Sequence, residues 1–153
     1  MNQHLSLIVG KGLIGKSLSE LISKSSSVII AHKNALQNAP NEVYLDLEDL
    51  SSFNCPKDIK VAYICASKTN KNYCENNPSE AHTINVINSL TLIKKLRNKN
   101  IFVVFLSSVE VFPGNKSKYE VKDKTNPTSS YGRFKAVSYT HLRDHETVLD
   151  LVC

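Results

Sequence analysis

The sequence predicts an α/β fold built on a doubly wound parallel sheet. Two observations predict it: short apolar runs typical of buried strands alternate with stretches of helical periodicity, and a glycine-rich turn directly follows the first run. With 153 residues, the chain is long enough for one hydrophobic core and too short for two ordinary domains. We therefore expect one sheet with helices on both faces.

Five apolar runs predict the strands, at residues 4–9, 28–31, 43–45, 61–66 and 101–106. A first helix is expected after the glycine turn, and a last helix near Ser129 or Ser130. A long helix is expected after Pro78, with one apolar face made of Ile84, Ile87, Leu90, Ile93 and Leu96. Strand–helix–strand connections of this kind are right-handed, so the strands run parallel.

The composition excludes several classes of protein. No apolar run approaches the length of a membrane span, and the N-terminus lacks a secretory signal, which predicts a cytoplasmic protein with no membrane partner. The four cysteines show no metal-ligand spacing and read as reduced thiols, so we expect no metal site. Although the formal charge is +5, the lysines are scattered, so an anionic small molecule is favoured over nucleic acid.

The first candidate site is Gly10-x-Gly12-x-x-Gly15, at the junction of the first strand and first helix. This is the Rossmann-like dinucleotide-binding pattern, in which the helix N-terminus meets a pyrophosphate and the intervening Leu13 and Ile14 join the binding loop. The alternative is a plain glycine turn in another α/β protein.

The end of the second strand bears on the choice of cofactor. An acidic residue there would bind the ribose 2′-hydroxyl of NAD, but the positions hold Ala31, His32 and Lys33. Two cationic side chains suit a 2′-phosphate, so NADP(H) is favoured over NAD(H). The alternative is that His32 and Lys33 are solvated loop residues.

The second candidate site joins Tyr131 and Lys135, which share one face of a helix, to Ser108 after the fifth strand. Together with the glycine motif, these residues resemble the extended short-chain dehydrogenase/reductases, the NAD(P)-dependent sugar-nucleotide epimerases, dehydratases and reductases. Residues 65–86 (CASKTNKNYCENNPSEAHTINV) resemble dTDP-4-dehydrorhamnose reductases more closely, since that family reads roughly AAxTxVDxCExxPxxAxxxNV there.

The sequence departs from the pattern of this family at two places. Its Val-Asp pair is Lys71-Asn72 here, and its Ser-Thr-Asp-Tyr-Val-Phe segment appears as residues 107–112, SSVEVF. The second departure puts the substrate assignment in doubt and leaves the hydroxyl of Ser108 in place.

The resemblance implies a role for each matched residue. Tyr131 would protonate the substrate carbonyl as hydride arrives, Lys135 would lower the pKa of Tyr131 and hold the nicotinamide ribose, and Ser108 would hydrogen-bond the same carbonyl. Asn85 would support the lysine through water. Further cofactor contacts would come from Asp46, Leu47, Cys65, Ala66 and Ser67. For Asp46, a helix cap before residues 48–50 is an equal alternative.

The function implied is NADP(H)-dependent reduction of a 4-keto sugar nucleotide. One alternative is an NAD-dependent sugar-nucleotide epimerase or dehydratase, and another is a non-catalytic NAD(P)-binding regulatory subunit. The helix that begins at Ser130 is a common dimer surface in this superfamily, so a homodimer of the full-length protein is open.

The end of the chain resembles something else. Residues 137–147 (VSYTHLRDHET) match a translated sequencing adapter at all positions but Asp144. We therefore expect residues 1–136 to be an incomplete NAD(P)-binding Rossmann domain, truncated at its C-terminal end. Residues 137–153 would be a non-native tail, and the chain itself would be inactive.

Overall fold

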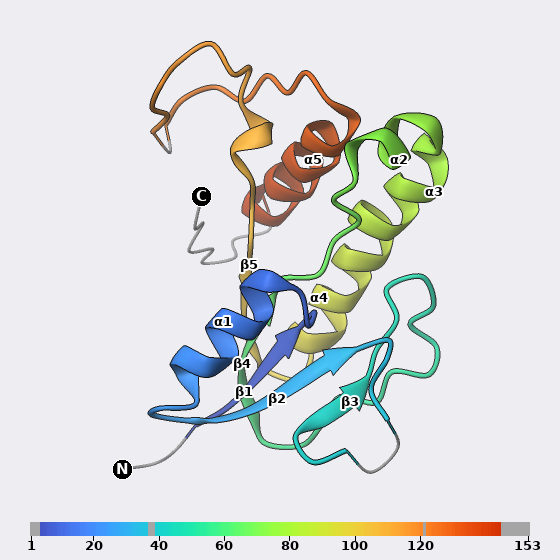
Figure 1. Cartoon of the computed structure of the whole chain (residues 1–153), viewed down its shortest axis with the longest axis vertical. Coiled ribbons are helices and arrows are strands. Elements are labelled where there is room, and N and C mark those ends of the chain that lie inside the picture. The colour runs from blue at the N-terminus through green and yellow to red at the C-terminus, as the bar shows by residue number, and fades with distance from the viewer. Residues whose placement is uncertain (1–3, 37–38, 121, 145–153) are drawn as a thin grey trace.

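The computed structural model describes residues 4–36, 39–120 and 122–144, and in them a five-stranded parallel sheet forms the centre of the molecule (Figure 1). The strand order is β3-β2-β1-β4-β5. The strands are β1 (Leu5–Val9), β2 (Ser27–His32), β3 (Glu42–Tyr44), β4 (Ile59–Ile64) and β5 (Phe102–Phe105). The prediction of a doubly wound α/β fold is confirmed, with every strand found within two residues of its expected place.

The order of the strands reverses between β1 and β4, which fixes where a ligand can bind. Because right-handed crossovers lead outward in both directions from β1, α1 (Leu13–Ile22) and α4 (Ser89–Arg97) cover opposite faces of the sheet (Figure 1). The loops after β1 and β4 diverge at this point, and open α/β sheets bind their ligands in that crevice.

The core is densest around β1, which pairs with β2 on one side and β4 on the other. Leu7, Ile8 and Val9 are fully buried, as the uninterrupted apolar run predicts for a central parallel strand. Ile64 and Phe105 extend the same core along β4 and β5.

The prediction of one regular long helix after Pro78 is wrong. The chain forms α2 (Lys71–Asn76), α3 (Pro78–His82), a π-helical segment (Thr83–Asn88) and α4. A π-turn holds more residues than an α-turn and rotates the residues that follow it. Ile87, predicted on the buried face, is therefore half exposed, whereas Ile93 and Leu96 are buried as expected.

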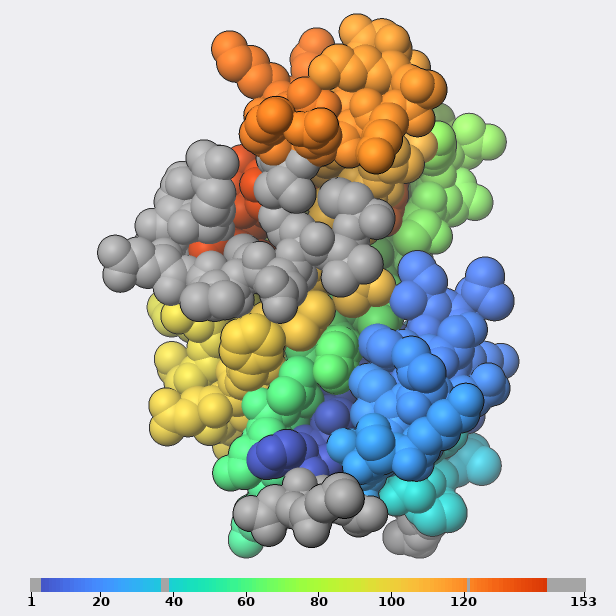
Figure 2. Space-filling view, turned by 90° about the vertical axis from the view of Figure 1, so that its left-hand side faces the viewer, coloured from blue at the N-terminus to red at the C-terminus, as the bar shows by residue number. Residues whose placement is uncertain are grey.

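Helix α1 buries little of its apolar surface against the described residues. Leu13 is 85% exposed and Leu21 is 62% exposed, while Gly15 alone in this helix is fully buried. Figure 2 shows α1 on the surface in blue, apart from the orange segment that follows β5. No helix in the described parts of the chain combines the length and the apolar character needed to cross a membrane.

The last elements follow β5. A short 3₁₀ turn, η2, spans Val109–Val111, and α5 spans Ser130–Asp144. The prediction that a helix begins near Ser130 is confirmed. Its N-terminal half packs against the π-helical segment and α2, which brings residues from both halves of the chain together.

Candidate functional site

The three glycines of the first motif act differently. Gly10 has φ +106°, and a Cβ there would lie 2.9 Å from the backbone nitrogen of Ala66. A Cβ on Gly15 would lie 1.9 Å from the carbonyl oxygen of Gly10, so this glycine lets the helix touch the turn. Around Gly12 nothing lies within 4 Å of such a Cβ. Gly12 thus faces open space at the N-terminus of α1, where free N–H groups suit an anion.

A cavity of about 330 Å³ opens beside this turn, at the carboxyl ends of β1, β2 and β4. Seven of the predicted cofactor-binding residues line it: Gly10, His32, Lys33, Asp46, Leu47, Ala66 and Ser67. Seven others are not among its lining residues: Gly12, Leu13, Ile14, Gly15, Cys65, Tyr131 and Lys135. The sheet thus brings together residues from four separate stretches of sequence, and the volume is in the range of small-molecule sites.

The cationic corner of this cavity already contains a carboxylate. Nε2 of His32 lies 2.9 Å from Oε2 of Glu42, and Lys11 pairs with the other oxygen of Glu42. The hydrogen bonds from Lys11 and His32 lower the pKa of Glu42. Lys33, in contrast, is exposed at the cavity. Sequence reasoning missed Glu42, because its contact with His32 exists only when β3 pairs with β2. That pairing sets Glu42 opposite Ile30, two residues before His32.

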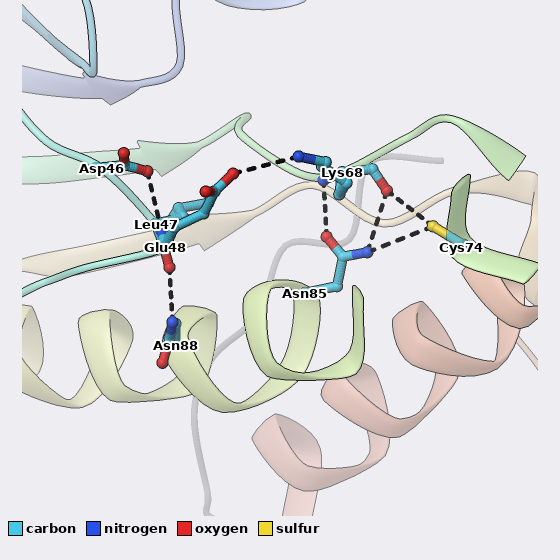
Figure 3. Close-up of polar contacts among 7 residues, drawn as sticks. All are labelled: Asp46, Leu47, Glu48, Lys68, Cys74, Asn85 and Asn88. Carbon is cyan, nitrogen blue, oxygen red and sulfur yellow. Dashed lines mark hydrogen bonds and ion pairs between the residues drawn. The ribbon is translucent and has the colours of Figure 1, made fainter. Parts of the chain in front are cut away.

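Asp46 and Leu47 also line the cavity. Oδ1 of Asp46 accepts a hydrogen bond from the backbone of Glu48 at 2.9 Å, which closes a local turn (Figure 3). No helix begins there, so the helix-cap alternative for Asp46 is wrong. Leu47 is 8% exposed, and its carbonyl accepts a hydrogen bond from Nδ2 of Asn88 at 2.7 Å.

Asn85 is buried and fully hydrogen-bonded to the loop after β4 (Figure 3). Its Oδ1 accepts from the backbone nitrogen of Lys68 at 2.7 Å and from the hydroxyl of Ser67 at 2.9 Å. Its Nδ2 donates to the Lys68 carbonyl at 3.0 Å. The amide therefore fixes the loop that lines the cavity. The water-mediated support of Lys135 that the resemblance implied stays a prediction.

The phenol of Tyr131 is where the cavity meets the second candidate site. Tyr131 is 8% exposed, and its burial raises its pKa. Hydrogen bonding to the hydroxyls of Ser67 and Ser108 lowers the pKa and offsets part of that rise. The fold thus brings Ser108 and Tyr131 together as predicted, and it adds Ser67, which also lines the cavity.

Lys135 lies one turn further along α5 and is 4% exposed. Its Nζ donates to the carbonyl of Leu106 at 3.1 Å and lies 4.5 Å from the ring centroid of Phe105. Burial lowers the pKa of Lys135 to about 8, while the Cys65 thiol acts in the opposite direction. Burial likewise raises the pKa of Cys65 to about 11. The site therefore holds a lysine that loses its proton near pH 8, below the ordinary lysine range.

The start of α5 is held by a carboxylate from α2. Glu75 accepts from the backbone nitrogen of Ser130 at 2.6 Å and from its hydroxyl at 2.8 Å. These two bonds, and then the charge of Arg133, lower the pKa of Glu75. A carboxylate at this helix end also meets the positive end of the helix dipole. Sequence reasoning did not single out Glu75, although it lies inside the 65–86 segment.

In the described ranges 4–36, 39–120 and 122–144, no three His, Cys, Asp or Glu side chains gather in an arrangement that could hold a metal ion. The candidate site offers a buried phenol, hydroxyl groups and an amine near a cavity in the size range of small-molecule sites.

Comparison with known proteins agrees with this arrangement. Residues 4–147 match the family described as RmlD substrate binding domain. The chain belongs to the RmlD substrate binding domain family. Among curated relatives of this RmlD-domain chain, the dTDP-4-dehydrorhamnose reductase of Mycolicibacterium smegmatis is 23% identical over 137 residues, which cover 88% of this chain and 40% of the relative. The methionine adenosyltransferase 2 subunit beta of Xenopus tropicalis is 28% identical over 134 residues, covering 85% and 40%.

Solved structures show the same RmlD-like fold. A hypothetical dTDP-4-dehydrorhamnose reductase from Sulfolobus tokodaii superimposes with a TM-score of 0.77 at 29% identity, covering 88% of this chain and 50% of that one. MoeE5 in complex with UDP-glucose and NAD gives 0.79 at 23% identity, covering 95% and 52%. The RmlD-domain chain thus spans about half the length of the proteins it matches.

Proposed function

We propose that this chain is the cofactor-binding part of an NADP(H)-dependent reductase acting on a 4-keto sugar nucleotide. The observation that carries the proposal is the Tyr131 phenol, which hydrogen-bonds to the hydroxyls of Ser108 and of Ser67, and Ser67 lines the cavity. The open space at Gly12 and the cavity beside it fit a dinucleotide, with its pyrophosphate at the start of α1.

The residues of the chain would divide the chemistry between them. When bound, the reduced nicotinamide supplies the hydride. Ser108 and Tyr131 hydrogen-bond the substrate carbonyl, and Tyr131 donates its proton to that oxygen as charge develops. Lys135 binds the nicotinamide ribose and, when charged, favours the phenolate left behind. Asn85 keeps Ser67 and Lys68, which line the cavity, in place.

Preference for NADP(H) would rest on Lys33 and on the balance of charge around Glu42. Lys33 is an exposed lysine at the cavity, whereas Lys11 and His32 contact the Glu42 carboxylate. A 2′-phosphate would meet Lys33 directly and would compete with Glu42 for Lys11 and His32.

Calorimetric titration with NADPH and NADH tests this part of the proposal. We expect NADPH to bind more tightly, Lys33→Ala to weaken NADPH about tenfold, and Glu42→Gln to tighten it, with NADH changed little in either variant. Lys24→Ala, an exposed lysine beyond α1, is the matched control. Equal affinity for NADPH and NADH in all variants would contradict the proposed preference for NADP(H). Tightly retained NAD after purification would favour the epimerase alternative.

A second candidate function is that of a regulatory subunit. It is favoured by the relative named methionine adenosyltransferase 2 subunit beta, which matches over most of this chain. Against it stand Ser108, Tyr131 and Lys135, all present and close together. Co-elution with a methionine adenosyltransferase catalytic subunit in gel filtration would favour this candidate over the reductase.

We also propose that residues 137–153 are a translated adapter and that residues 1–136 are the natural part of the chain. Helix α5 runs through this boundary to Asp144, with Ser138 and Leu142 buried. The test is an adapter-free read of the source DNA across codons 131–153. A reading frame that differs from the printed residues after Ala136 supports the proposal, and an identical frame refutes it.

Three further expectations complete the proposal: a cytoplasmic location, a nucleotide sugar as substrate and no multiple turnovers by this chain alone. The last is checked by following NADPH absorbance after adding dTDP-4-dehydrorhamnose. The open homodimer alternative is tested by sedimentation of the full-length protein.

A further inference from the structure

Two of the positions at which this chain departs from the reductase pattern lie in contact. Nζ of Lys71, at the start of α2, lies 2.7 Å from Oε1 of Glu110 in η2. Oε2 of the same carboxylate accepts a hydrogen bond from the hydroxyl of Ser129 at 3.2 Å, one residue before α5. One carboxylate therefore joins α2, η2 and the start of α5.

Further contacts link Glu110 to Ser108 and to the turn of α5 that carries Tyr131. Its backbone nitrogen donates to the hydroxyl oxygen of Ser108 at 3.2 Å. On the other side, the Ser129 hydroxyl accepts from the backbone nitrogen of Gly132 at 3.0 Å. A Cβ on Gly132 would lie 2.1 Å from the carbonyl oxygen of Glu110, so the two backbones touch. In the sequence, Tyr131 lies between Ser129 and Gly132, the two residues that these contacts hold.

We propose that Glu110 is a positioning residue that holds the first turn of α5 against η2 and so sets the Tyr131 phenol against Ser108. The proposal rests on the proposed role of Tyr131 as the acid. Lys71 contributes by pairing with the oxygen of Glu110 that Ser129 does not use. The Lys71–Glu110 pair thus places opposite charges at two positions where the family pattern has uncharged residues.

The electrostatic effect of Glu110 on Tyr131 gives the proposal a second readout. Besides burial, two neighbouring acidic groups, the Cys74 thiol and the Glu110 carboxylate, raise the pKa of Tyr131. Removing the negative charge of Glu110 while keeping a hydrogen-bond acceptor should therefore lower the pKa of Tyr131.

Amide hydrogen exchange on the 153-residue chain provides the first test. In Glu110→Ala, the Gly132 amide should exchange about tenfold faster, because the Ser129 hydroxyl that accepts from it loses its own anchor, while β1 amides keep their rates. Glu110→Gln retains an oxygen for Ser129 and should restore the protection. Glu120→Ala removes an exposed carboxylate that pairs with Lys122 and serves as the control. Unchanged exchange at Gly132 in Glu110→Ala overturns the proposal.

NMR titration of ¹³C-labelled tyrosine, with Tyr131 assigned through Tyr131→Phe, decides the case in which Glu110→Ala unfolds. A lower pKa of Tyr131 in Glu110→Gln supports the proposal, and an unchanged pKa overturns it. Neither measurement needs cofactor or sugar. A chain that fails to bind NADPH yet shows both effects would refute the proposed function and leave Glu110 as the residue that positions Tyr131.

Discussion

Asn85 accepts a hydrogen bond from the backbone nitrogen of Lys68 at 2.7 Å and returns one to the Lys68 carbonyl at 3.0 Å (Figure 3). A side-chain amide thus satisfies both backbone groups of one loop residue, as a neighbouring strand would. The loop after β4 forms part of the cavity lining. The shape of the cavity therefore depends on an amide that comes from the π-helical segment.

Replacing this amide should loosen the cavity wall and the whole fold. Asn85→Ala leaves the part-buried N–H of Lys68 and the hydroxyl of Ser67 without their acceptor and takes one of two donors from the Lys68 carbonyl, which should lower the free energy of unfolding by about 3 kcal/mol. The matched control is Asn88→Ala, which removes one half-buried bond to the Leu47 carbonyl and should cost about 1 kcal/mol. Urea denaturation measures both, and equal losses would contradict the importance given to Asn85.

The glycines should separate stability from cofactor binding. Gly15→Ala places a methyl group 1.9 Å from the Gly10 carbonyl and should destabilise the fold by about 3 kcal/mol or more. Gly12→Ala meets no atom within 4 Å and should unfold like the wild type. It should still weaken NADPH binding about tenfold or more, because the methyl group enters the space proposed for the pyrophosphate. Wild-type affinity in Gly12→Ala would move the pyrophosphate elsewhere.

Lys135 should make stability depend on pH in a predictable direction. Its pKa is about 8 in the fold and 10.5 ordinarily, so between these values the unfolded chain binds the extra proton and stability rises with pH. Below pH 8 both states are protonated and the burial cost is fully present. Relative to Lys135→Met, the wild type should gain about 3 kcal/mol between pH 7 and pH 10.5.

Denaturation of both proteins at several pH values checks this, because the difference cancels the cysteines and tyrosines that titrate in the same range. A constant difference would show that the amine keeps its ordinary pKa.

Glu75 should contribute stability that is lost in acid. Its pKa is lowered by the N–H and hydroxyl of Ser130, so the folded state favours the charged form. The contribution is present above the ordinary value of 4.5 and disappears as pH falls through the lower folded pKa. The urea midpoint of the wild type should exceed that of Glu75→Gln at pH 6, and the gap should close toward pH 3. Glu20→Gln, on the exposed part of α1, should show no such gap.

Much of the fold followed from local signals. Each predicted strand is an apolar run with Gly, Ser or Pro nearby, and such runs are extended wherever they are buried on both faces. The glycine turn of residues 10–15 was predicted at the junction of β1 and α1, where it is found, because a turn from a strand into a helix allows few backbone conformations. The association of Ser108 with Tyr131 was also predictable, since both follow the same strand at the carboxyl edge of the sheet.

The sequence by itself therefore determined the sheet, the glycine turn and the residues that meet at its edge. The tertiary structure alone decided how polar groups pair across elements: Glu42 with His32, Glu75 with Ser130, and Glu110 with Lys71. It also decided the π-turn that exposes Ile87. The physical reason is that periodicity and turn chemistry act between neighbours in sequence, whereas a charged side chain takes whichever partner the packing of distant elements brings within reach.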